Sequence, residues 1–209
     1  MNKLAKFITY LTFPGTWAVL GIFLYQPNKP VFVGISILMY VIIPMSFVAY
    51  MVYKKRFASL ELATTKERRL AVPFAFIASL ICIYFLKDNG ANATILLWSF
   101  LVSFSLLIQY IFTLINAKIS IHSLSSAAFA TFFLLHFANR TQWVFDIPES
   151  LKSIPIGLFI LFFLGINSLV FWARKSLKAH SSFELILGIA IGISLTFVNE
   201  YLLLTFLWN

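Results

Sequence analysis

A histidine and a carboxylate near the C-terminus have the spacing of a catalytic pair. His180 and Glu184 are four residues apart, so on a helix they share one face. The carboxylate can accept a hydrogen bond from one imidazole nitrogen, which leaves the other nitrogen unprotonated and directed outward, as a nucleophilic or basic histidine requires. Arg174, six residues before His180, offers a forked guanidinium that suits phosphate. The pattern indicates histidine chemistry on a phosphate.

The segments that must position these residues are long and apolar. Of the 209 residues, 61% are hydrophobic and 11% are charged, and the mean hydropathy is +0.92. A soluble domain of this size cannot bury so much apolar side chain, so we expect an all-α integral membrane protein. In such a protein, a net charge of +9 indicates the membrane topology and attraction to anionic lipid headgroups, and we expect no nucleic-acid partner. The single cysteine, Cys82, excludes an intrachain disulfide and a cysteine metal cluster.

Seven apolar segments predict one domain, residues 1–209, built as a bundle of six to seven transmembrane helices with a polar site at one membrane boundary. Each segment is close to the length of about 20 residues that a helix needs to cross the hydrocarbon. Pro14 and Gly15 break the first segment, so it is the least certain full crossing. The expected number of crossings is therefore six or seven. The expected spans are about 8–25, 31–53, 70–86, 94–115, 120–138, 156–173 and 182–207.

Seven crossings place three polar clusters on one side of the membrane, in the loops after the second, fourth and sixth spans. The clusters are Thr64–Arg69, Lys118–Ser123 and Arg174–Glu184. We expect basic side chains and Ser120 to bind a phosphate oxyanion, His180 to attack phosphorus and His122 to protonate the leaving oxygen. The basic candidates are Arg68, Arg69, Lys118 and Arg174. This chemistry needs no metal and no cofactor.

Each of these residues also has a simpler interpretation. Arginines and lysines beside a span act as topology anchors, and a histidine at a helix start is often a cap or an interfacial residue. We expect His136 to be interfacial and Gln109 and Asn167 to form hydrogen bonds between helices. Glu200 is harder to dismiss, because a carboxylate within a span is costly. Gly188 and Gly192 form a small-xxx-small pair that allows close approach of another helix and can hold the start of their helix against the site.

The clusters resemble the three signatures of the type 2 phosphatidic acid phosphatase superfamily, over about residues 44 to 192. Arg174-x5-His180-x3-Glu184 is similar to the third signature, Ser120-Ile121-His122 to the second, and Lys66 to Arg69 with Pro73 to the first. The resemblance implies that His180 is a phosphohistidine nucleophile, Glu184 its orienting carboxylate and His122 the general acid. It also implies that Arg174, Ser120 and Arg68 or Arg69 bind phosphate.

Five features of the chain depart from that pattern, and one of them is that no proline precedes Ser120. Ala173 stands in place of serine, Glu184 in place of aspartate and Ile121 in place of glycine, and no lysine stands seven residues before Arg68 or Arg69. Lys118 is a candidate substitute for that lysine. These departures keep several hypotheses open.

The first hypothesis is a membrane lipid phosphatase, a metal-independent hydrolase of phosphatidic acid, phosphatidylglycerol phosphate or polyprenyl phosphates and diphosphates. The second is a weak or inactive relative that acts as a lipid-binding or scaffold subunit. A transporter is a third, although midmembrane charges are scarce. All three are multi-pass proteins, and we expect a bacterial inner membrane. Twelve of the 16 Lys and Arg lie on the side of the site, and Lys29, Lys87, Arg140 and Lys152 lie on the other, so the charge count favours a cytoplasmic site. The resemblance leaves a periplasmic site open.

Overall fold

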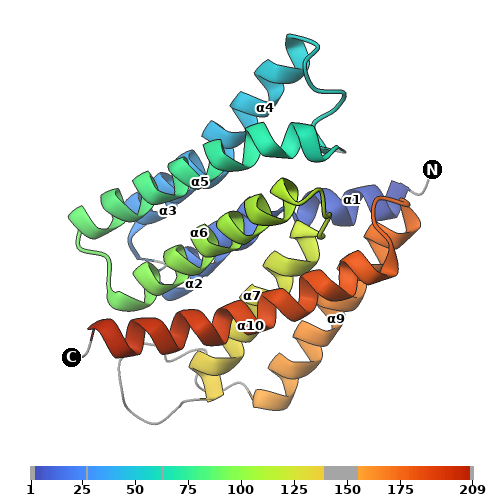
Figure 1. Ribbon diagram of the computed structural model, residues 1–209. Helices are drawn as coiled ribbons and strands as arrows, with labels where there is room; N and C mark the ends of the chain where they lie inside the picture. The colour runs from blue at the N-terminus through green and yellow to red at the C-terminus, as the bar shows by residue number, and fades with distance from the viewer. Residues whose placement is uncertain (1–2, 27, 63, 139–154, 208–209) are drawn as a thin grey trace.

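The computed structural model describes residues 3–26, 28–62, 64–138 and 155–207, and this part of the chain is helical and has no β-strand (Figure 1). Arg140 and Lys152 lie outside the described residues. The elements in chain order are α1 (Lys3–Leu11), α2 (Pro14–Tyr25), α3 (Pro30–Ile37), the π-helix η1 (Leu38–Ile42), α4 (Ile43–Tyr53), α5 (Thr65–Asp88), α6 (Ala93–Leu114), α7 (Ile121–Ala138), α9 (Ile156–Ser176) and α10 (Ser182–Leu207).

Among the residues that the structure describes, five helical segments are long and apolar enough to cross a membrane. They are Pro30–Tyr53, which combines α3, η1 and α4, and Thr65–Asp88, Ala93–Leu114, Gly157–Ser176 and Ser182–Leu202. The helices α1 and α2 make a sixth crossing if the pair, bent by 47°, is one broken span. The remaining expected span is a shorter apolar helix, Ile121–His136. The expectation of an all-helical, multi-pass membrane protein is confirmed, with five to six long apolar helices.

Prolines account for both irregular spans. Pro14 is the first residue of α2, and the break before it separates α1 from α2. Pro44 cannot donate to the carbonyl of Tyr40, and a π-helical turn precedes it. A Cβ on Gly15 of α2 would lie 2.8 Å from that same carbonyl oxygen, so only glycine lets α2 pack over the freed group. A neighbouring helix thus covers the backbone that the proline disrupts.

Close packing between α7 and α10 depends on the two glycines of α10. A Cβ on Gly188 would lie 2.7 Å from the carbonyl oxygen of Ser120, and one on Gly192 would lie 2.4 Å from that of Leu124. Both distances are shorter than real Cβ contacts, so the two backbones approach as closely as glycine permits. The expectation for this pair is confirmed, and Gly188 holds the start of α10 against the start of α7.

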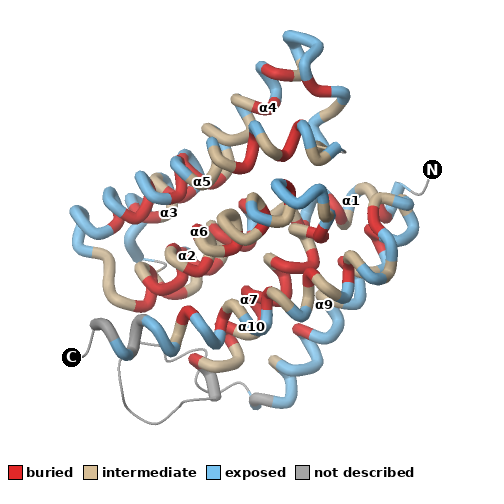
Figure 2. Tube along the Cα trace, viewed as in Figure 1, coloured by how far each residue is buried: buried red, intermediate tan, exposed pale blue. Residues whose placement is uncertain are grey.

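The core lies among α2, α6 and α7 (Figure 2). The Nε1 atom of Trp98 in α6 donates a hydrogen bond of 2.9 Å to the carbonyl of Ala18 in α2, and its ring packs against Phe129 and Phe132 of α7. In contrast, α9 exposes many large apolar side chains along its outer face, among them Leu161, Phe162 and Leu164. That arrangement suits a helix whose outer face meets lipid, while aromatic packing fixes the interior.

Candidate functional site

Tight helix ends bring the polar clusters together at the end of the bundle where the N-terminus lies (Figure 1). The helix α9 closes with Lys178 in the left-handed region at φ 52°, and the Ala179 N–H donates to the carbonyl of Arg174 over 3.1 Å. The helix α6 closes similarly around Asn116, at φ 57°. The four non-glycine residues with positive φ in the described chain, Lys55, Leu62, Asn116 and Lys178, all lie in the loops at this end. Local strain is therefore concentrated beside the clusters.

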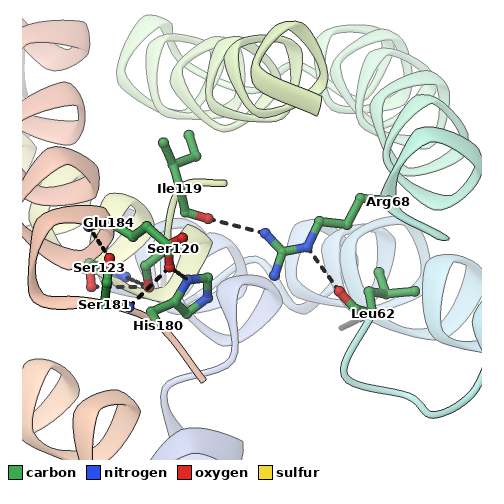
Figure 3. A network of polar contacts seen from close by, with 8 residues as sticks. All are labelled: Leu62, Arg68, Ile119, Ser120, Ser123, His180, Ser181 and Glu184. Carbon is green, nitrogen blue, oxygen red and sulfur yellow. Dashed lines mark hydrogen bonds and ion pairs between the residues drawn. The ribbon is translucent and has the colours of Figure 1, made fainter. Parts of the chain in front are cut away.

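Two backbone contacts join the three clusters. The Nη1 atom of Arg68, from the first cluster, donates to the carbonyl of Ile119 in the second over 3.2 Å. The N–H of Ser120 donates to the carbonyl of Glu184 in the third over 3.3 Å. Figure 3 shows the guanidinium of Arg68 and the imidazole of His180 pointing toward one another from opposite sides of this network. The clusters thus meet at one end of the bundle, as the arrangement of the loops predicted.

His180 is held by the carboxylate of Glu184. The Nδ1 atom of His180 lies 2.9 Å from Oε2 of Glu184, and the Ser181 N–H donates to the same oxygen over 3.1 Å. The Ser181 hydroxyl in turn accepts from the Glu184 N–H over 3.2 Å, which completes a capping box at the start of α10. Because the carboxylate only accepts, Nδ1 carries the hydrogen and Nε2 is left as the basic nitrogen.

The Nε2 atom of His180 is buried and makes no hydrogen bond with any described residue. Burial lowers the pKa of His180 from 6.5 to about 4; the hydrogen bond with Glu184 opposes this shift, and the positive charges of Arg68 and Arg174 add to it. The imidazole is therefore neutral at physiological pH. A neutral, oriented imidazole with a free Nε2 is the form that attacks an electrophile.

Two buried guanidinium groups supply positive charge. Arg68 and Arg174 are 6% and 4% exposed. The Nε atom of Arg68 donates to the carbonyl of Leu62 over 2.9 Å, and Leu62 has the unfavourable φ of 50°. The side chain of Arg174 makes no hydrogen bond with the described residues, and its Nε is buried without an acceptor. A buried guanidinium without acceptors is costly, so this side chain is suited to an anionic ligand.

His122, in the first turn of α7, completes the group. It lies within electrostatic range of Arg174, His180 and Arg68, and the backbone of Thr9 in α1 adjoins it. Its Nδ1 atom is buried and has no hydrogen-bond partner among the described residues. Two imidazoles and two guanidiniums from four helices or their ends therefore surround one small region, with polar atoms available to a ligand. We call Arg68, His122, Arg174, His180 and Glu184 the histidine–arginine cluster.

Three predicted phosphate ligands have other surroundings. Arg69 donates to the carbonyls of Thr113 and Leu114 and to the side chain of Asn116, so it holds the end of α6. Lys118 is exposed and makes no hydrogen bond or ion pair with the described residues. The Ser120 hydroxyl accepts from the N–H and the hydroxyl of Ser123 and thereby caps α7. Of the candidate pair Arg68 and Arg69, only Arg68 belongs to the histidine–arginine cluster.

Several contacts of the site were not predicted. Thr9 and Leu62 act through their backbones. Glu61, an exposed acid in the loop between α4 and α5, interacts electrostatically with Arg174. Backbone roles are independent of side-chain type, so no sequence pattern marked them. Within the described residues, no group of three or more His, Cys, Asp or Glu side chains is placed to hold a metal ion.

A second histidine–carboxylate pair lies at the other end of α7. The Nε2 atom of His136 lies 3.0 Å from Oε1 of Glu200, and His136 is buried at 3% exposure. His136 is thus a buried partner of Glu200, where an interfacial residue was expected. His136 gives the Glu200 carboxylate a hydrogen-bond partner, which explains how an acidic side chain is tolerated within a span. Asn167, as expected, bonds between helices, because its Oδ1 accepts from the Ser126 hydroxyl over 2.9 Å.

Comparison of the chain with protein-family models, with curated proteins and with solved structures finds no match.

Proposed function

We propose that the protein is a membrane lipid phosphatase that hydrolyses a phosphomonoester or diphosphate of a lipid through a phosphohistidine intermediate. One observation carries this proposal: Arg174 Nε, His180 Nε2 and His122 Nδ1 are all buried without hydrogen-bond partners in the described structure. A bound phosphate group offers acceptors for the guanidinium and places phosphorus within reach of an imidazole. The resemblance of the three clusters to the type 2 phosphatidic acid phosphatase signatures supports the same chemistry.

The reaction proceeds in two displacements. In the first, Nε2 of His180 attacks phosphorus, the bond from phosphorus to the lipid oxygen breaks, and His122, protonated in the complex with the phosphate anion, gives its proton to that oxygen. Glu184 keeps the hydrogen on Nδ1 and stabilises the positive charge that develops on the ring. In the second, neutral His122 takes a proton from water, the hydroxide oxygen bonds to phosphorus, and the bond from phosphorus to Nε2 breaks with its electron pair returning to His180, so that inorganic phosphate leaves. Arg68 and Arg174 stabilise the equatorial oxygens throughout.

The substrate class follows from the position of the cluster at the ends of apolar helices. A headgroup at this depth belongs to a molecule anchored in the bilayer, such as phosphatidic acid, phosphatidylglycerol phosphate or a polyprenyl phosphate. We place the chain in a bacterial inner membrane, with α7 as an additional short crossing and the bent pair α1–α2 as another. The excess of Lys and Arg on the side of the site favours the cytoplasmic boundary.

A second candidate is a lipid-binding or scaffold subunit without turnover. Arg69, Ser120 and Glu184 all have structural roles, at the end of α6, at the start of α7 and in the capping box of α10. These roles explain the positions of the three residues without catalysis and favour the second candidate. The two candidates share a phosphate-binding cluster and differ in whether His180 forms a covalent bond to phosphorus.

Phosphate release by the purified full-length protein in detergent distinguishes them. The substrates are phosphatidic acid, phosphatidylglycerol phosphate and undecaprenyl diphosphate, with EDTA present and no added metal. We expect release that falls by about 10³-fold or more in His180→Ala. His136→Asn, which changes the histidine at the far end of α7, is the matched control and should keep the rate of the unmodified protein. No release by folded protein from any of these lipids would favour the subunit without turnover.

A further inference from the structure

An apolar cavity of about 150 Å³ lies beside the histidine–arginine cluster, within the membrane-spanning part of the bundle. Its walls come from α2, from η1 and α4, and from α5, α6 and α7. Small side chains on separate helices leave the space, among them Ala18, Ala75 and Ala128. Apolar spaces of this size accept small hydrocarbon groups such as benzene.

The cavity is continuous with the cluster along two helices. On α5, Arg68 is followed by the wall residues Val72 and Ala75 at intervals of four and three residues, so all three share one helix face. On α7, the wall residues Ile121 and Ser125 flank His122 in sequence and on the helix surface. From Arg68 to Ala75 a helix rises about 10 Å. The cavity therefore extends inward from the position of the headgroup, in the direction of a lipid tail.

Two further residues mark the boundary between the polar and apolar parts. Leu62 supplies the carbonyl that accepts from Arg68, and it also lines the cavity. Gln109 is buried at the end of α6 nearest the cluster and lines the cavity. Its side chain makes no hydrogen bond with the described residues, where a bond between helices was expected. Its amide suits the oxygen atoms that join a phosphate to its hydrocarbon chain. Below that level the wall is almost entirely apolar, with Trp98 and Leu101 at its inner end.

We propose that this cavity holds a single hydrocarbon chain of the lipid phosphate whose headgroup binds the histidine–arginine cluster; the proposal rests on the proposed function for the identity of the headgroup. A volume close to that needed by one benzene ring holds the part of one chain nearest the headgroup and leaves no room for a second chain. The ligand class is thus a phosphate with at least one slender linear chain, either alkyl or isoprenoid. A diacyl lipid would insert one chain and leave the other in the bilayer.

Photolabelling of the full-length protein tests the chain site without relying on turnover. The probes are dodecyl phosphate and farnesyl phosphate, each with a diazirine in the middle of the chain, and labelled peptides are identified by mass spectrometry. We expect labels on the cavity walls of α5 and α6, near Ala75 and Leu106. Ala75→Leu should reduce these labels by about tenfold or more, since each buried methylene contributes about fourfold to binding. The probe that labels more strongly identifies the alkyl or isoprenoid source.

The matched control is Ala190→Leu, which makes the same change on an exposed position of α10 away from the cavity. It should leave labelling unchanged. Labels confined to outward faces such as that of α9, and equal in both variants, would overturn the chain site; the unmodified protein alone gives this answer if a variant fails to fold. Cavity labelling without phosphate release from either probe would support the chain site and overturn the phosphatase. Phosphate release with labels only on outward faces would support the phosphatase and overturn the chain site.

Discussion

The Nδ1 atom of His180 lies 2.9 Å from the Oε2 atom of Glu184, and that same oxygen accepts the Ser181 N–H at the start of α10. One carboxylate therefore caps a helix and orients an imidazole. The cap fixes the carboxylate through the backbone, so the ring is held by a group that the fold itself immobilises. Changing this carboxylate therefore affects both the start of α10 and the orientation of the free Nε2.

Glu184→Gln separates the cap from the orientation of His180. Glutamine at this position can still accept the Ser181 N–H, so the capping box is retained, but it cannot stabilise a charged imidazole. We expect phosphate release to fall by about 10²-fold while the midpoint of thermal unfolding changes little. If Glu184 were only a cap, the rate of this variant would match that of the unmodified protein.

The pH dependence follows from the lowered pKa of His180, about 4 in the folded protein against 6.5 for an ordinary histidine. Nε2 is unprotonated well into the acid range, so loss of the nucleophile should lower kcat/KM only as the pH falls from about 5 toward 4. Arg174 contributes to lowering the pKa, so Arg174→Gln should move this decline to higher pH. Glu184 raises the pKa, so Glu184→Gln should move it to lower pH. Shifts of the opposite sense would contradict this assignment.

Folding stability should depend on pH in the same window. Because the folded-state pKa of His180 is lowered, the unfolded chain binds the proton more tightly. The free energy of unfolding should include this contribution fully above pH 6.5 and lose it as the pH falls from 6.5 to about 4. Denaturation of the unmodified protein and His180→Gln across this range measures the difference. Parallel curves for the two proteins would show that His180 titrates normally.

Arg174 and Arg69 should have opposite effects when changed to glutamine. The side chain of Arg174 is buried and makes no hydrogen bond with the described residues, so Arg174→Gln should leave stability unchanged or increase it. It should lower kcat/KM by about 10²- to 10³-fold, through loss of a donor to the transition state. Arg69→Gln removes the hydrogen bonds that close α6 and should cost about 1–3 kcal/mol in the free energy of unfolding.

The activity of folded Arg69→Gln should stay near that of the unmodified protein. Chemical denaturation and phosphate release are measured on the same samples. Equal losses of stability in both arginine variants would contradict the distinct roles.

Gly188→Ala should disturb both packing and the site. The added methyl would lie 2.7 Å from the Ser120 carbonyl oxygen, so α10 must move away from α7. We expect a loss of about 1–3 kcal/mol in the free energy of unfolding. Release should also fall, because Ser120 and Glu184 are joined across this contact. Gly165→Ala is the control, since a Cβ there meets no atom within 4 Å. Because alanine favours a helix more than glycine does, Gly165→Ala should keep or slightly raise stability, and the same change in Gly188→Ala would contradict the close packing.

Much of this protein was predictable from local patterns in the sequence. Long apolar runs interrupted by polar loops predicted an all-helical membrane bundle, because an unpaired backbone is too costly in hydrocarbon. The four-residue spacing of His180 and Glu184 predicted their contact, and Gly188 with Gly192 predicted close helix packing. These inferences held because helix geometry alone determines which nearby residues share a face.

Contacts between distant segments were decided only by the tertiary structure. Adjacent arginines point in directions about 100° apart on a helix, so whether Arg68 or Arg69 met His180 depended on the rotation of α5. The pairing of His136 with Glu200 and the capping role of Ser120 depended on the packing of α7 against α10. The apolar cavity arises where alanines from separate helices meet. No spacing within a single segment encodes the rotation and separation of packed helices, so these features required the fold.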